Sequence, residues 1–163
     1  MSLASSAAMT TSATLCSSQI EYEYSLIQER LQMATDTNTQ LGEELFKAQT
    51  LLSQCQTQVP TLLSYITMME SSKSAQPQSK NNEDVTSQLN ILKQNYTRMK
   101  QAYVPLMQRV AYLKLQKQKA HQEEMMLTKQ LKSMEIKKKL ADQTAEVGAK
   151  FVDNAVKRLS FNA

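Results

Sequence analysis

The chain has 163 residues with a net charge of +4, and only two are glycine and three are proline. Sheet folds need turn residues at frequent intervals, so this composition excludes a β-sandwich and an α/β fold. Tryptophan is absent and phenylalanine occurs three times, which leaves few aromatic anchors for a thick core. The totals predict an all-α protein of long helices that bury part of their apolar surface against partner helices.

The cysteines and the distribution of apolar residues bear on the cell compartment. Cys16 and Cys55 are the only cysteines and lie in segments of different character, so we expect free thiols in a reducing compartment. No run approaches the roughly 20 apolar residues of a transmembrane helix. The first 18 residues carry no charge and so lack the basic start of a secretory signal. We expect a cytoplasmic protein without a transmembrane segment.

Residues 1–18 are rich in serine, threonine and alanine and show no periodicity. This composition predicts a disordered leader. An uncharged Ser/Thr-rich start also occurs in bacterial secreted effectors and their regulators. A helical component of a bacterial secretion system is therefore one of the open interpretations.

Residues 19–72 are predicted to form the first long helix, with Ser17 or Ser18 as N-cap and a kink near Pro60. Apolar residues recur there at alternating spacings of four and three. This seam comprises Ile20, Tyr24, Ile27, Leu31, Ala34, Asn38, Leu41, Leu45, Ala48, Leu52, Cys55, Val59, Leu62, Ile66 and Met69. Such spacing is typical of a helix that packs along its length against other helices, so the sequence predicts a coiled coil.

Asn38 is the plainly polar member of this seam, and the spacing puts it at an a position. A buried asparagine at an a position fixes the register and the number of strands at some cost in stability. The alternative is a local weak spot, exposed where partner helices leave a gap.

Residues 73–83 contain Pro77 and no periodicity, which predicts a polar linker. Residues 84–147 are predicted to form a second long, basic helix, and Gly148 to mark a hinge before a short helical tail at 148–163. The second seam comprises Leu89, Leu92, Tyr96, Met99, Tyr103, Leu106, Val110 and Leu113. The same stepping then meets Lys117, Ala120, Glu124, Leu127, Leu131, Met134, Lys138 and Ala141, and the polar residues among these predict a weaker seam.

The two predicted helices differ in charge. Residues 19–72 hold seven acids and two bases, a net charge of −5, whereas residues 84–163 hold fifteen bases and seven acids, a net charge of +8. An acidic helix and a basic helix can fold back as a hairpin with complementary flanks. The remaining positive surface would otherwise face an acidic partner such as a microtubule, a nucleic acid or a lipid head group, or only solvent.

The sequence offers no set of residues for catalysis. His121 is the only histidine, so no metal site of the His/Cys type and no Ser-His-Asp triad is expected. Two glycines cannot build a phosphate-binding loop, and no recognisable nucleic-acid-binding module accompanies the basic residues. We expect a protein that is not an enzyme, has no cofactor or metal and does not bind nucleic acid.

Two stretches resemble the small helical subunit of the spindle-and-kinetochore-associated (Ska) complex. The matching residues are Ile27-Gln28, Arg30-Leu31 and Thr37-Asn38, then Val85-Thr86, Leu89, Ile91-Leu92-Lys93, Tyr96, Met99, Tyr103 and Pro105-Leu106. The resemblance implies a non-catalytic subunit at the junction of kinetochore and microtubule in mitosis, located at the spindle or kinetochore. Microtubule contact would be indirect, because the microtubule-binding domains of that complex reside on the partner subunits.

The chain is also similar to the pallidin family, a subunit of the complex that builds lysosome-related organelles (BLOC-1). The residues that carry this likeness are Leu31-Gln32, Leu41, Leu45, Leu113-Lys114-Leu115-Gln116 and Glu123-Glu124. This resemblance implies a scaffold in organelle trafficking.

Together these observations predict two long helices in an elongated coiled-coil hairpin or rod that folds fully with the helical subunits of a hetero-oligomeric complex. We expect both seams to bind partner helices and to set their register.

Overall fold

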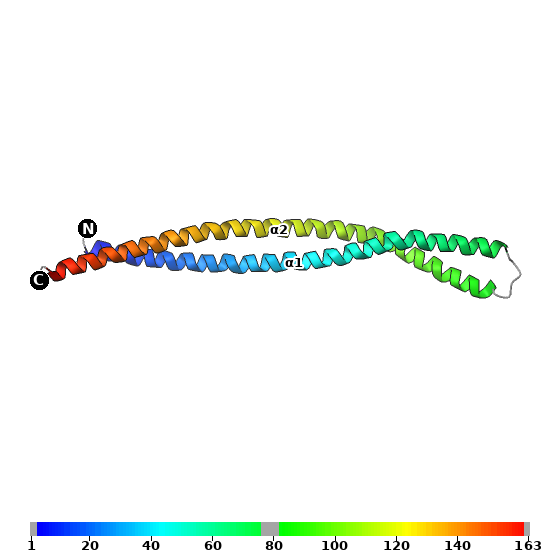
Figure 1. The fold of residues 1–163 in the computed structure, drawn as a ribbon, viewed down its shortest axis with the longest axis horizontal. Coiled ribbons are helices and arrows are strands. Elements are labelled where there is room, and N and C mark those ends of the chain that lie inside the picture. Colours follow the sequence, from blue (N-terminus) through cyan, green and yellow to red (C-terminus); the bar gives the residue numbers. More distant parts are fainter. Residues whose placement is uncertain (1–2, 76–81, 162–163) are drawn as a thin grey trace. The chain divides into compact units, whose positions relative to one another are not determined.

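The computed structural model describes residues 3–75 and 82–161, and all of these lie in two α-helices (Figure 1). Helix α1 spans Leu3–Ala75 and helix α2 spans Asn82–Phe161. No β-strand occurs in the described ranges. The prediction of an all-α protein with two long helices is therefore confirmed.

Helix α2 continues through Gly148 to Phe161 without a separate tail, which differs from the bounds expected. At its N-terminal end, helix α1 includes residues of the segment 1–18. Exposed hydroxyls bond to the helix backbone in this first segment: Thr11 Oγ1 donates to the carbonyl of Ala7 at 2.9 Å. Of the linker expected at 73–83, residues 76–81 lie outside the described residues, and the rest belongs to the helices.

Both helices continue through a proline. Pro60 lies inside α1 and Pro105 inside α2, and both are exposed. Each proline lacks the N–H that would bond to the carbonyl four residues earlier, which belongs to Gln56 or Gln101. Despite this missing bond, α1 continues on both sides of Pro60, so the helix is not broken where the kink was expected.

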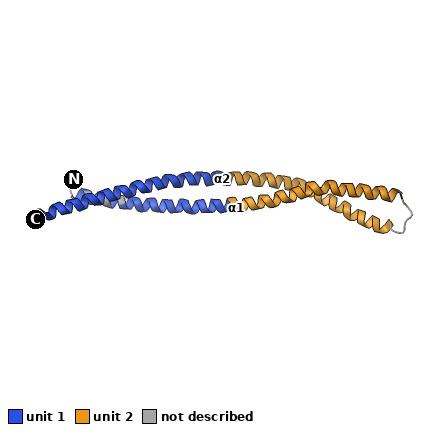
Figure 2. Cartoon of the chain, viewed as in Figure 1, with its two compact units in different colours: residues 1–37, 120–163 blue, residues 38–119 orange. Residues whose placement is uncertain are grey.

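The chain divides into two units, each containing one segment of α1 and one of α2 (Figure 2). Unit 1 comprises Met1–Thr37 and Ala120–Ala163, and unit 2 comprises Asn38–Lys119. In unit 1, hydrogen bonds join Ser17 to Asp142 at 3.0 Å, Tyr24 to Glu135 at 3.3 Å and Thr35 to Glu124 at 3.0 Å. The residue numbers in each pair add to 159, so the two segments run antiparallel in one fixed register.

Unit 2 has the same antiparallel register. Gln56 Nε2 donates to the hydroxyl of Tyr103 at 3.3 Å, again a pair whose numbers add to 159. Ala48, Val110 and Leu113 form a buried cluster, and Leu41, Leu45 and Leu52 pack against it. Residues from both helices therefore share one apolar core in this unit.

The buried residues form one stripe on each helix. Among the described residues the buried apolar ones are Ala34, Ala48, Cys55, Ile66, Leu89, Val110, Leu113, Ala120, Leu127 and Met134. All of these apolar residues belong to the predicted four-and-three stepping, and Gly148 is buried as well. Leu127 is fully buried, whereas large apolar side chains outside the stripe of α2, such as Ile136 and Leu140, are more than half exposed.

Replacing Leu127 with alanine should destabilise the hairpin by about 2–4 kcal/mol, because the buried methyl groups are lost and a cavity remains. Chemical denaturation followed by helical circular dichroism measures this change. Leu140→Ala on the same helix is the matched control, since Leu140 is 58% exposed and its loss should cost less than about 0.5 kcal/mol. Equal effects of the two variants would contradict the assignment of the core.

Candidate interaction surfaces

All nineteen residues predicted to bind partners lie on the inward stripes. Ile66, Leu89, Val110 and Leu113 are buried. The other fifteen are half-buried: Ile20, Tyr24, Ile27, Leu31, Asn38, Leu41, Leu45, Leu52, Val59, Leu62, Leu92, Tyr96, Met99, Tyr103 and Leu106. Their burial arises within this chain, because the stripe of each helix faces the other helix. A role for these residues in partner binding stays a prediction. A partner that binds the closed hairpin would also contact residues outside the two stripes.

The polar positions of the second stripe are accommodated by residues of α1. Glu124 is half-buried and accepts the hydrogen bond from Thr35. Lys138 Nζ lies 3.3 Å from Glu21 Oε1 and 5.7 Å from the centre of the Tyr24 ring. The stripe expected to weaken after Leu113 therefore continues through unit 1.

Lys117 departs from the predicted seam. Its side chain is exposed, and Gln116 takes the half-buried position. The Lys117 side chain lies beside Gly42, where an added Cβ would be 3.4 Å from Lys117 Nζ, an ordinary van der Waals contact. Gly42, Phe46 and Lys117 contribute to the lining of an open groove of about 520 Å³ on this side of unit 2.

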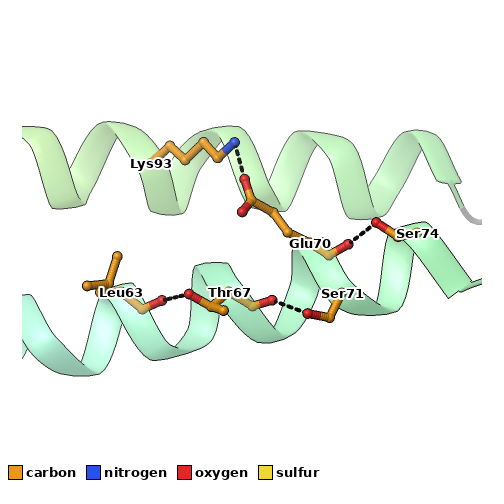
Figure 3. A network of polar contacts seen from close by, with 6 residues as sticks. All are labelled: Leu63, Thr67, Glu70, Ser71, Ser74 and Lys93. Atoms are coloured by element: carbon orange, nitrogen blue, oxygen red, sulfur yellow. Dashed lines mark hydrogen bonds and ion pairs between the residues drawn. The ribbon is translucent and has the colours of Figure 1, made fainter.

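Ion pairs join the acidic helix to the basic one, as the charge asymmetry predicted. Lys93 pairs with Glu70 (Figure 3), and Arg109 Nη2 lies 3.7 Å from Glu44 Oε2. The side chains of all four residues are about half-exposed. Exposed pairs contribute about 0–1 kcal/mol each, so they favour the antiparallel pairing without supplying most of its stability.

Hydroxyl groups on the outer surface of α1 are bonded to the helix itself. Thr67, Ser71 and Ser74 each donate at 2.9 Å to the carbonyl four residues earlier (Figure 3). These bonds satisfy the hydroxyls locally, as is common for serine and threonine within helices. This Ser/Thr-rich face therefore needs no partner to satisfy its polar groups.

Charged side chains near the end of α2 pair along the helix. Lys150 Nζ lies 2.8 Å from Glu146 Oε1. The hydrogen bond from Lys150 and its positive charge lower the pKa of the exposed Glu146 carboxyl. The pair spans one turn of the same helix and creates no site.

The described residues offer no metal site and no catalytic cluster. No group of three or more His, Cys, Asp and Glu side chains comes together there. His121 is exposed, with its Nδ1 3.6 Å from Glu124 Oε2. Within the same residues, neither helix contains a stretch apolar and long enough to cross a membrane.

Large apolar side chains are exposed along both helices. They are Leu15, Tyr22, Leu26, Met33, Phe46, Leu51, Leu63, Tyr65, Met68, Ile91, Val104, Met107, Tyr112, Leu115, Met125, Met126, Ile136, Leu140, Val147, Phe151, Val156, Leu159 and Phe161. Reasoning from the sequence missed them, because it followed one stripe per helix. Leu51 and Leu63 could have indicated a second apolar surface, because each is a leucine directly next to a seam residue in the sequence.

A groove of about 450 Å³ opens between α1 and α2 in unit 2. We call it the unit 2 groove. It is lined by Gln58, Thr61, Leu62, Tyr65, Asn95, Arg98 and Met99. Most of its lining surface is apolar, and seam residues Leu62 and Met99 contribute to it. The edge of the core is therefore accessible from outside at this point.

Comparisons with protein-family models, curated proteins and solved structures find no match to this chain. Its class is a two-helix antiparallel hairpin.

The register predicts that Ala48→Cys and Val110→Cys, combined in one chain lacking Cys16 and Cys55, form an intramolecular disulfide on mild oxidation. Ala48 and Val110 contact each other in the core of unit 2. Combining Ala48→Cys with Tyr103→Cys shifts one partner by two helical turns, about 10 Å, and should prevent the bond. Mobility on non-reducing gels measures both. Efficient bonding in the shifted pair would contradict the register.

Proposed function

We propose that this chain is a non-catalytic coiled-coil scaffold subunit of a multiprotein assembly. The supporting observation is the large surface that remains exposed. The chain exposes 12237 Å², whereas a compact monomer of 18.4 kDa exposes roughly 8,200 Å². The excess suits a protein that buries further surface on association with other helical subunits.

The exposed apolar side chains support the same proposal. Phe46, Tyr65, Met68 and Tyr112 are all more than half exposed. Large apolar patches on a folded protein mark surfaces that bind other proteins, and aromatic and methionine side chains are enriched in such interfaces. Helical partners would bury these residues without any change in the hairpin core.

Within this class, our first proposal is the assembly that joins kinetochore and microtubule in mitosis. It rests on the resemblance to the small Ska subunit, several residues of which occupy the inward stripes, including Leu31, Leu92 and Met99. These residues would keep the hairpin closed, and the contact with microtubules would be made through partner subunits. The protein would then be found in the cytoplasm and at the spindle or kinetochore.

The second proposal is a pallidin-like scaffold in the biogenesis of lysosome-related organelles. Leu115 and Glu123, which contribute to that resemblance, lie on the exposed surface of α2. They would be available to a partner without opening the hairpin. Imaging of a tagged copy through the cell cycle separates the two proposals: spindle signal in mitosis favours the first, and punctate organelle signal in interphase favours the second.

Leu45→Asp should abolish the recovery of partner subunits when the tagged full chain is purified from its own cells. Leu45 packs on the cluster of Ala48, Val110 and Leu113, and a charge there should open the hairpin at a cost of several kcal/mol. His121→Ala should leave recovery unchanged, because the His121 side chain is exposed. Mass spectrometry of the purified material measures both. Full recovery of partners with Leu45→Asp, or none with the wild type, would contradict the scaffold proposal.

A further inference from the structure

One segment of α1 lacks the charges expected of a helix that faces water. Residues 48–69 contain no Asp, Glu, Lys or Arg, although the flanking Lys47 and Glu70 are charged. Solvent-facing helices usually carry charged residues on the face opposite the core. Within this segment Leu51, Leu63, Tyr65 and Met68 are exposed. The segment therefore has the composition of a helix that is covered on more than one side.

Heptad positions identify which side is the more apolar. With Leu62 and Met99 in the seam at d positions, the residues that line the unit 2 groove occupy g, c and d positions of both helices. In an antiparallel pair the g positions of both helices border the same side. The ion pair between Glu44 and Arg109 joins two g positions and confirms this arrangement.

The same spacing places further exposed apolar residues on the side of the groove. Leu51 precedes the groove residue Gln58 by one heptad, and Ile91 precedes Arg98 by one heptad. Leu51 and Ile91 are both at least half exposed. Tyrosine, methionine and arginine with few other charges are the composition of a protein interface core.

We propose that a second copy of this chain packs on this side of unit 2, so that α1 of each copy lies against α2 of the other in an antiparallel four-helix bundle. The two copies would be related by a two-fold axis parallel to the helices, which makes the contact self-complementary. This self-association goes beyond the scaffold role and does not depend on it.

Charge favours this arrangement of the two copies. Between residues 84 and 119, α2 carries seven bases and one acid, Asp84. Direct packing of α2 on α2 would bring like charges together, which costs free energy. With α1 of one copy on α2 of the other, the two basic segments lie on the diagonal, and each faces the uncharged segment 48–69 and the nearby g-position acid Glu44.

The available area suits a dimer. The 22 uncharged residues span about 33 Å of helix, and two packed helices are about 20 Å wide. The side of the hairpin therefore offers roughly 650 Å² per copy, near the lower end of the 600–1,000 Å² per partner found in specific interfaces. An interface of this size falls within the range of specific dimers.

Sedimentation velocity of the full chain over a concentration series tests the proposal. The wild type should dimerise, and Tyr65→Glu combined with Ile91→Glu should raise the dissociation constant by about 100-fold, because two charges enter an apolar interface. Tyr65 and Ile91 are 53% and 58% exposed, so circular dichroism should show unchanged helix content. The matched control is Leu63→Glu combined with Val104→Glu. These residues are 47% and 55% exposed, but their e and b positions place them on the other side, so the constant should change less than about threefold.

Disulfide formation between copies tests the arrangement of the helices. Thr61 and Arg98 both line the unit 2 groove, and their numbers add to 159, which places them at the same level of the bundle. In a background without Cys16 and Cys55, a chain carrying Thr61→Cys and a chain carrying Arg98→Cys should form a mixed disulfide dimer. Each chain alone should form at least tenfold less, because α1 lies diagonal to α1 and α2 diagonal to α2.

Several results would overturn the proposal. A wild type that remains monomeric at about 100 μM would exclude the second copy as the occupant. An equal rise in the dissociation constant for both double variants would exclude it too. Cross-links confined to the Thr61→Cys chain alone would exclude the α1-on-α2 arrangement. A monomer that still recovers partner subunits from cells would leave the scaffold proposal standing, so failure of one proposal is distinguishable from failure of the other.

Discussion

Burial of one apolar stripe of α1 against one apolar stripe of α2 is the interaction on which the other features of the structure depend. Other contacts between the helices are mostly exposed, such as the ion pair Glu70–Lys93 and the hydrogen bond Ser17–Asp142. Exposed pairs of this kind contribute about 1 kcal/mol or less. The stripe therefore provides most of the stability, while the exposed pairs distinguish the antiparallel register from shifted ones. A helix that buries only one stripe leaves its other sides open to further helices.

The sequence was sufficient to predict both the fold class and the inward stripes. Alternating spacings of four and three place residues on one side of a helix irrespective of what covers it, so Leu31, Leu62 and Val110 were assigned correctly. Lys117 was the exception. A lysine has a long flexible side chain that can leave the stripe, and whether it does so depends on the residue opposite. The Lys117 side chain lies beside Gly42 of α1, and spacing within α2 carries no information about that residue.

The helix ends and the outer surfaces could not be predicted in the same way. Serine, threonine and alanine differ in helix propensity by less than about 1 kcal/mol, so composition does not determine whether α1 begins near Leu3 or near Gln19. Gly148 costs a helix about 1 kcal/mol relative to alanine, yet it lies buried in the α2 stripe, where close packing continues. The exposed apolar residues lie outside the two predicted seams, so the four-and-three spacing did not identify them.

Polar residues within the stripe help to fix the register in which α1 and α2 pair. Glu124 is bonded to Thr35, and Lys138 to Glu21, so these residues are accommodated by the chain's own helices. Only one alignment of the helices brings each polar residue to its counterpart, and a shift by one heptad would separate both pairs. The interior of the hairpin thus specifies how α1 meets α2 and has no need of an external helix. Under the scaffold proposal, selection among partners would then depend on the outer residues, above all those around the unit 2 groove, where apolar side chains are accessible and charges are scarce.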